Sequence, residues 1–370
     1  MNSIVSYFKP FSKNISSEFP TAKTEEYRYS NVITTLSALT VEAAIGKKIN
    51  IPTKGDFSFF SDQVLENCAT KTFEELPKNY HRHENYFKQA SLAKDNKFYE
   101  ITCDKTEMSL DFVASKASVL TDKVYIHVPS QKKVQIYLNF YTEDNSLSIP
   151  MIYIDAQDNT HVELIYTVEK KHNTGVVAPL FELIAQEKSH VSLQTFTQGI
   201  NNHRLTFIGF CAGANSHIDL RSGFHLQNKE SCDLFVRIYH EAADSTSNQM
   251  IKTVVLDSSQ MNFNGLIYAN GEAHNIYAYQ MLKGMILSDD AQILARPQLD
   301  IEYFELACSH GVSIGGFDPE ELFYLKSRGI PNKEVYPLLL YGFFTEPFIE
   351  IPLEAYWISR IKNLLGTKQI

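Results

Sequence analysis

The stretch Ala156-Gln-Asp-Asn-Thr-His-Val-Glu-Leu164 returns, with substitutions, as Ala185-Gln-Glu-Lys-Ser-His-Val-Ser-Leu193 and as Ala212-Gly-Ala-Asn-Ser-His-Ile-Asp-Leu220. Each copy has a polar turn, a small hydroxyl residue, a histidine and then an alternating apolar segment. The three histidines follow one another after 29 and 27 residues. Sequence repeats of this length are typical of solenoids, in which each repeat forms one coil that packs against the next.

The segments between the turns have the character of β-strands. They are rich in Val, Ile, Tyr, Phe and Thr and alternate with a period of two residues, as half-buried strands do. They cover residues 134–141, 161–168, 190–197, 234–240 and 262–268. Because no helical pattern of useful length interrupts residues 109–300, the sequence predicts a mainly β protein. The regular turn spacing favours a parallel β-helix over a β-sandwich.

The repeated histidines, His161, His190 and His217, have two interpretations. If coils stack in register, the three imidazoles lie at one corner of the solenoid, where they could hold a metal ion. The other interpretation is a polar position at the exit of each turn, with a structural role only.

The flanking segments differ from the repeats. Residues 1–95 contain helix-like segments at 25–39 and 57–70, and we expect an N-terminal helical domain there. The β-helix should occupy 96–317, followed by a C-terminal helical domain at 318–370. In that domain Asp318 is a good N-cap, Pro319 suits the first helical position and Gly329 suits the helix end. Further helices are expected at 332–344 and 354–365.

Charge and hydropathy exclude some classes of function. The net charge of −9 argues against nucleic-acid binding, which needs a basic surface. The strongly apolar stretch at 335–344 is much shorter than the about 20 residues that span a bilayer. The first residues lack the pattern of a secretory signal, so we expect a cytoplasmic protein that binds no membrane. No GxxxxGK[ST] loop occurs, and an ATP-binding P-loop is therefore not expected.

The cysteines point to one candidate site. Four of the five, Cys68, Cys103, Cys211 and Cys232, stand apart from any CxxC motif and are expected to be buried, unreactive thiols. Cys308 is different because His310 follows it two residues later. On an extended strand the two side chains point to the same face. A thiolate and an imidazole so placed can bind iron, zinc or an iron–sulfur cluster.

The region around this pair has a distinctive string of residues. It begins with Ala295-Arg-Pro-Gln-Leu-Asp-Ile301, continues with Cys308-Ser-His-Gly311 and ends with Leu322-Phe-Tyr-Leu-Lys-Ser-Arg-Gly-Ile330. Asn262-Phe-Asn-Gly265 with Gln280, and Leu287-Ser-Asp-Asp-Ala291, precede it. Together these motifs resemble the SufB/SufD family of iron–sulfur cluster assembly scaffold proteins. Gly311 is similar to the SufD branch, since the SufB branch usually has Glu there.

The resemblance implies a right-handed parallel β-helix flanked by N-terminal and C-terminal α-helical domains. It also implies partners: a SufC-type ABC ATPase docked on the C-terminal helices, and a SufB-like paralogue, or a second copy of the chain, paired through the β-helix. Cys308 and His310 match the family's residues at that junction, and Glu346 is a weaker candidate ligand. The resemblance also predicts a group of residues near the ATPase; the alternative is that they belong to the hydrophobic core of this chain. They are Phe323, Tyr324, Leu325, Arg328, Gly329 and Ile330.

Three functions remain open from the sequence. The leading hypothesis is a non-enzymatic, SufD-like scaffold of a SufB–SufC–SufD complex that assists iron entry. Iron or a transient iron–sulfur cluster would bind at the complex interface, and none tightly in the isolated chain. The first alternative is a SufB-like homodimeric scaffold. The second is a β-helix enzyme acting on carbohydrate, which would need paired carboxylates among Asp155, Asp158, Glu163 and Asp219.

Overall fold

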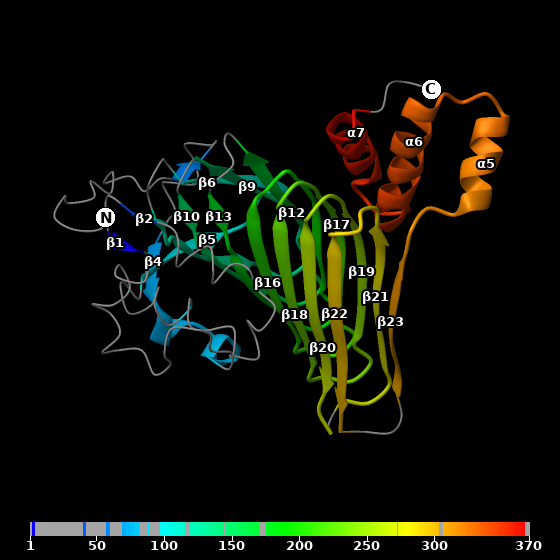
Figure 1. Ribbon diagram of the computed structural model, residues 1–370. Helices are drawn as coiled ribbons and strands as arrows, with labels where there is room; N and C mark the ends of the chain where they lie inside the picture. Colours follow the sequence, from blue (N-terminus) through cyan, green and yellow to red (C-terminus); the bar gives the residue numbers. More distant parts are fainter. Residues whose placement is uncertain are drawn as a thin grey trace.

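The chain folds into a parallel β-solenoid with a small helical domain packed against one side (Figure 1). This computed structural model describes residues 2–3, 40–41, 57–59, 69–81, 88, 97–114, 119–143, 146–170, 175–271, 273–302 and 306–366. Within them, the predicted mainly β, parallel solenoid is confirmed. From residue 97 onward, the longer strands alternate between two sheets, which face each other and enclose the core.

The first sheet has the order β22-β20-β18-β16-β14-β11-β8-β5-β4. Its strands are β4 (Ala69–Thr72), β5 (Lys97–Thr102), β8 (Lys123–Val128), β11 (Met151–Ala156), β14 (Leu180–Ala185), β16 (Asn202–Cys211), β18 (Ser231–His240), β20 (Gln260–Ala269) and β22 (Gln292–Ile301). Three short strands, β7 (Val119–Leu120), β10 (Leu147–Ser148) and β13 (Val176–Val177), extend this sheet beside β16.

The second sheet has the order β23-β21-β19-β17-β15-β12-β9-β6-β3. Its strands are β3 (Phe57–Phe59), β6 (Glu107–Ala114), β9 (Lys133–Thr142), β12 (His161–Lys170), β15 (His190–Gln198), β17 (His217–Leu226), β19 (Thr246–Val255), β21 (Ile276–Ile286) and β23 (Leu306–Gly315). Only β3–β6 and β4–β5 pair antiparallel within the two sheets as described. A separate antiparallel pair joins β1 (Asn2–Ser3) and β2 (Thr40–Val41).

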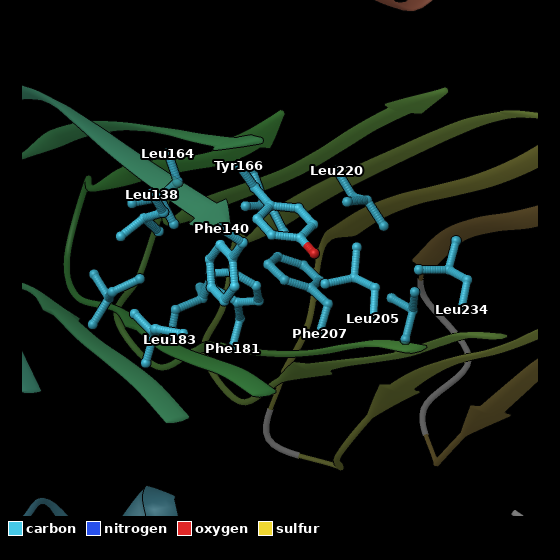
Figure 2. Close-up of a cluster of buried hydrophobic side chains, with 14 of the residues drawn as sticks. Leu138, Phe140, Leu164, Tyr166, Phe181, Leu183, Leu205, Phe207, Leu220 and Leu234 are labelled. Atoms are coloured by element: carbon cyan, nitrogen blue, oxygen red, sulfur yellow. The ribbon is translucent and has the colours of Figure 1, made fainter. Parts of the chain in front are cut away.

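The two sheets share one apolar core. Figure 2 shows side chains such as Leu138, Leu164 and Leu220 of the second sheet facing Leu183 and Phe207 of the first. All five are inaccessible to solvent. Because burial of one such side chain contributes about 1.5–3 kcal/mol, these stacked apolar rows stabilise the solenoid along its whole length.

The corners explain the repeated sequence pattern. The turns before β12, β15, β17 and β19 each place one residue in the left-handed region, a conformation that Asn and Asp adopt more readily than most residues. These residues are Asn159, Lys188, Asn215 and Asp244, with φ between 55° and 59°. In three of these four turns the hydroxyl residue that follows closes the turn by donating to the carbonyl three residues earlier. Thr160, Ser189 and Ser245 do so at 2.7–2.8 Å.

The C-terminal helices begin and end close to the predicted residues. They are α5 (Pro319–Ser327), α6 (Asn332–Thr345), a 3-10 turn η5 (Glu346–Phe348) and α7 (Glu354–Leu364). Asp318 caps α5 by accepting from the Glu320 N–H at 2.8 Å, and Gly329 has the left-handed φ of 84° that ends a helix. No helix within the described ranges is long and apolar enough to cross a bilayer.

The helical domain packs on the outer face of the second sheet. Phe196 and Val254 of the sheet meet an apolar cluster made by Phe344, Phe348, Trp357 and Ile361. Gly223 permits this contact, because a Cβ atom there would lie 2.6 Å from the Phe196 ring and 3.2 Å from Phe344. The Trp357 indole also donates to the Gln194 side chain at 2.6 Å, which fixes α7 against β15.

The N-terminal part differs from the prediction where it is described. The helix expected over residues 57–70 is wrong at both ends, since Phe57–Phe59 and Ala69–Thr72 are strands. These two strands pair with β6 and β5, and this pairing overrides the helical pattern. Two 3-10 turns follow, η3 (Phe73–Glu75) and η4 (Lys78–His81). The helix expected over residues 25–39 lies outside the described residues.

A buried ion pair fastens this N-terminal part to the first sheet. The Lys88 ammonium donates to both Glu182 carboxylate oxygens, at 2.7 and 3.0 Å, and to the Tyr80 carbonyl at 2.5 Å. Both side chains are almost inaccessible, at 2% and 0% exposure. Burial raises the pKa of Glu182 to about 7, even though Lys88 acts in the opposite direction.

We therefore expect asymmetric effects when one partner is removed. Glu182→Gln should lower the free energy of unfolding at pH 7 by about 3–5 kcal/mol, because the buried Lys88 ammonium group loses its carboxylate partner. Lys88→Met should cost less, since Glu182 can take up a proton at its raised pKa. Urea unfolding measures both changes. The control is Glu187→Gln, which removes an exposed partner of Lys188 and should cost at most about 1 kcal/mol. Equal costs for all three variants would contradict the prediction.

Candidate functional site

Cys308 and His310 lie on β23, where the solenoid ends. Among the described strands, β23 pairs with β21 alone, and β22 is likewise the terminal strand of the first sheet. Cys308 stands beside Ala278 and His310 beside Gln280, both of which are buried, whereas Tyr279 between them is exposed. The two candidate residues thus lie on the inward face of the last coil, at the open end of the solenoid.

The pair has the relation that the sequence predicts. Two residues apart on a strand, the side chains leave the same face about 7 Å from each other. Cys308 is half-buried and packs against the small apolar cluster that contains Ile276 and Ala278. His310 is exposed. One candidate ligand is therefore half-buried and the other is exposed to solvent, and two protein ligands alone would leave the coordination sphere of iron or zinc incomplete.

A buried amide lies directly behind His310. Gln280 donates from Nε2 to the Gln249 Oε1 atom at 2.6 Å, while its own Oε1 has no hydrogen-bond partner. Gly265 makes room for this amide, because a Cβ atom there would lie 2.5 Å from the Gln280 oxygen. Since Gln280 is the register partner of His310, its free oxygen is placed to accept a hydrogen bond from a neighbouring donor.

The thiols fall into two groups. Burial raises the pKa of Cys103 to about 11 and that of Cys211 to about 12, and it also raises the pKa of Cys232 well above its usual value. These three are buried protonated thiols, as predicted, and Cys68 lies outside the described residues. Burial also raises the pKa of Cys308, although a backbone hydrogen bond at Ala278 acts in the opposite direction. A metal ion or a partner's positive charge would therefore have to stabilise the Cys308 thiolate.

Glu346 has two ammonium partners. Its carboxylate bonds to Lys252 and, at 2.9 Å, to Lys283, so that it joins η5 to strands β19 and β21. Burial by itself raises the pKa of Glu346, but the hydrogen bonds and charges of the two lysines outweigh it and hold the pKa below its usual value. A metal ion at Glu346 would have to compete with both ammonium groups.

Helix α5 carries the residues expected to face a partner. No described residue of α5 is buried, and Phe323 and Tyr324 are 74% and 55% exposed. The Arg328 guanidinium lies 5.1 Å from the centre of the Tyr324 ring. Leu325 and Ile330 are partly buried, and Gly329 is exposed. Phe323 and Tyr324 are therefore surface residues rather than core residues of this chain.

The four carboxylates considered for carbohydrate chemistry do not come together. Asp155 lies on the first sheet and accepts a hydrogen bond from Tyr125 at 2.9 Å. Asp158 caps the backbone of Glu187 in a corner turn. Glu163 and Asp219 lie on the other sheet, two strands apart.

The sequence motifs do not predict the roles of two residues, one next to His310 and the other next to His190. Gln280 was noticed only as part of a motif, although a glutamine at an inward position of a strand is itself a signal. Asp219 was considered only for carbohydrate chemistry, yet the structure brings it to His190 of the preceding coil, at 3.2 Å. The alternation of inward and outward side chains along the strand could have indicated Gln280. The contact of Asp219 with His190 depends on the register between coils.

Comparisons with known proteins agree with this architecture. Residues 112–343 match the family described as SUF system FeS cluster assembly, SufBD core domain. The iron-sulfur cluster assembly protein SufD of Escherichia coli is 31% identical over 156 residues, which are 41% of this chain and 37% of that protein. The SufD protein of Bacillus subtilis is 37% identical over 102 residues, 28% of this chain and 23% of that protein.

A longer but more distant match is the chloroplastic protein ABCI7 of Arabidopsis thaliana. It is 23% identical over 272 residues, 62% of this chain and 57% of that protein. The chain thus aligns with about half or less of the length of most of these relatives. The matched family region runs from β6 to α6 and contains Cys308 and His310.

The lysine contacts of Glu346 predict a role in holding the helical domain. Glu346→Gln should increase amide hydrogen exchange in α6 and α7 about 10-fold, since a hydrogen bond to a charged group contributes about 1.5–3 kcal/mol. The same loosening should appear in the wild type as the pH falls through the lowered pKa of Glu346, because protonation removes the charge. Glu350→Gln, which changes an exposed carboxylate four residues later, is the control. Unchanged exchange in Glu346→Gln would refute this role.

Proposed function

The chain belongs to the SufBD family of SUF-system iron–sulfur cluster assembly proteins, and on that premise we propose that it is a SufD-like scaffold subunit. In this proposal it pairs end to end with a SufB-like subunit, and a SufC-type ATPase docks on its helical domain. The observation that carries the proposal is the open solenoid end, with Cys308 and His310 on its inward face.

The terminal coil has the properties of a docking surface. The outer edges of β22 and β23 present backbone donors and acceptors that no described strand satisfies. Exposed apolar side chains accompany them on β23, with Val312 and Ile314 at 40% and 42%. A second solenoid that continues the two sheets would satisfy the edges and cover these side chains.

The cargo of the proposed site is iron or a transient iron–sulfur cluster. Cys308 and His310 supply a thiolate and an imidazole, which are suitable ligands for iron. Because the chain offers only part of a ligand set there, the remaining ligands would come from the partner. This incompleteness is the physical reason to expect no tightly bound cluster in the isolated chain and to assign it no catalytic step of its own.

The first experiment is the native mass of the assembly after co-expression with the SufB-like and SufC-type proteins of the same cell. A stable ternary complex supports the proposal. A homodimer that builds clusters without the SufB-like protein would favour the alternative of a homodimeric scaffold. A chain that ignores both partners would overturn the proposal.

The exposed aromatic pair on α5 gives a sharper test of ATPase docking. Phe323→Ser with Tyr324→Ser should weaken the binding of the SufC-type protein at least about 10-fold, because aromatic anchors contribute about 2 kcal/mol or more at interfaces. Isothermal titration measures the affinity. The control is Ile349→Ser, which removes a 48% exposed apolar side chain outside α5. Binding that is equally strong in all three proteins would place the ATPase elsewhere.

The site pair predicts a loss of cluster formation without a loss of assembly. Cys308→Ser and His310→Gln should each lower cluster content in the co-expressed complex at least about 10-fold, since each removes one ligand from a partial set. Visible absorbance and iron content measure the loss. Ser309→Ala is the matched control, because Ser309 lies between the two on the opposite face of the strand. A full cluster content in both ligand variants would exclude these residues as ligands.

A further inference from the structure

The histidine ladder lies on the outer face of the second sheet, away from the solenoid end. His161, His190 and His217 are the first residues of β12, β15 and β17 and are direct register partners. Their ring centres are separated by 4.6 and 4.4 Å, with the rings nearly perpendicular. Each side chain is about one third exposed, at 31–32%. The apolar residues that follow the three histidines lie in the core, so the imidazoles point outward.

A single buried carboxylate lies beneath two of these imidazoles. Asp219 follows His217 by two positions on the same face, and its side chain is only 6% exposed. Its Oδ1 atom lies 2.9 Å from His217 Nε2, and its Oδ2 atom lies 3.2 Å from His190 Nε2. One ligand atom from each of the three residues lies within 4.8 Å of the others. The distances of 2.9 and 3.2 Å from Asp219 to the two imidazole nitrogens are short enough for donors that share one ion at about 2.0–2.2 Å.

The carboxylate is incompletely satisfied by the protein. Oδ1 of Asp219 is buried and is left without a geometrically good hydrogen bond, although His217 Nε2 lies 2.9 Å from it. A buried acceptor without a partner is costly, and a bound cation would satisfy it.

The neighbours of this cluster orient its members. The Nδ1 atom of His217 bonds to the Thr246 hydroxyl on the next strand. When Nδ1–H donates to Thr246, the Nε2 lone pair of His217 is free and directed at the space beside Asp219. On the other side, the Arg221 guanidinium lies 3.5 Å from Oδ2 of Asp219 and donates to the Pro347 carbonyl at 3.0 Å. Ligating carboxylates and imidazoles in metal sites are commonly held by such outer contacts.

We propose that His190, His217 and Asp219 form a mononuclear binding site for a divalent transition-metal ion of the zinc class. Two imidazoles and one carboxylate suit Zn²⁺ or Fe²⁺ rather than Mg²⁺ or Ca²⁺, which prefer all-oxygen sets. Because both imidazoles are partly exposed, the remaining coordination positions face solvent. The site is separate from Cys308, which lies three strands away, about 14 Å, and on the inward face of the sheet. The proposal therefore does not depend on the proposed scaffold function.

The test uses the full chain after chelator treatment, in a Cys308→Ser, His310→Gln background that removes the solenoid-end ligands. Titration with Co²⁺ should give one equivalent of a visible d–d spectrum without a thiolate band, and calorimetry with Zn²⁺ should give the same stoichiometry. Removal of a ligand, by His217→Gln or Asp219→Asn, should lower the affinity about 100-fold or more. Thr246→Val, which removes only the outer contact of His217, should lower it about 10–100-fold.

The ladder offers a matched control. His161→Gln changes the same position of the preceding coil, with the same exposure, and should keep the metal affinity within about twofold. If Asp219→Asn fails to fold, the partly exposed His190→Gln tests the site alone, and circular dichroism monitors the fold. Zn²⁺ should raise the melting temperature of the control but not of the ligand variants. Equal binding by His161→Gln and His217→Gln, or no stoichiometric binding by the parent protein, would overturn the proposal.

Discussion

The parallel, in-register pairing of successive coils is the constraint on which the rest of the molecule depends. Each corner turn returns the chain to the same register, so that His161, His190 and His217 become direct neighbours despite their separation in sequence. Residues of one kind therefore stack in rows along the solenoid. The apolar rows make the core, whereas among the described strands the last row, at β22 and β23, has no neighbour to complete it. For that reason, residues that could bind a ligand or a partner are expected in two places: in a row of stacked polar side chains, or at an open end of the solenoid.

One inward row shows how the core changes toward the open end. Register partners along this row are Leu164, Leu193 and Leu220, followed by Gln249, Gln280 and finally His310. The two amides are inaccessible to solvent, and each has one side-chain atom without a hydrogen-bond partner. Such atoms cost about 1–3 kcal/mol each, so a purely structural row would be expected to stay apolar. The two glutamines lie next to a candidate site and lower the stability of the core. Residues of this kind are expected where function, rather than stability, determines the amino acid.

Much of the fold could be predicted from the sequence, because it follows from local patterns. The corner residues and alternating strands gave the solenoid, and Asp318 and Gly329 gave the limits of α5. The arrangement of individual groups could not be predicted in the same way. Lys88 meets Glu182 because the N-terminal part folds back on the first sheet, and Glu346 meets Lys252 because of how the helical domain docks. For Cys308 and His310 the pattern predicted their common face but not the buried amide behind them. Contacts between distant segments depend on tertiary packing, which no local period encodes.

The second sheet carries one candidate site on each of its two faces, because successive side chains along a strand point to opposite faces. Its inward face carries the row that ends at His310. Its outward face carries the histidine ladder at the start of the strands and the helical domain farther along them. Arg221 connects these two outer features, since it contacts Asp219 at 3.5 Å and the Pro347 carbonyl at 3.0 Å. A change at Asp219 therefore reaches the helical domain through one side chain, whereas it reaches Cys308 only across the backbone of a packed sheet. The geometry thus couples the ladder to the helical domain more directly than to the solenoid end.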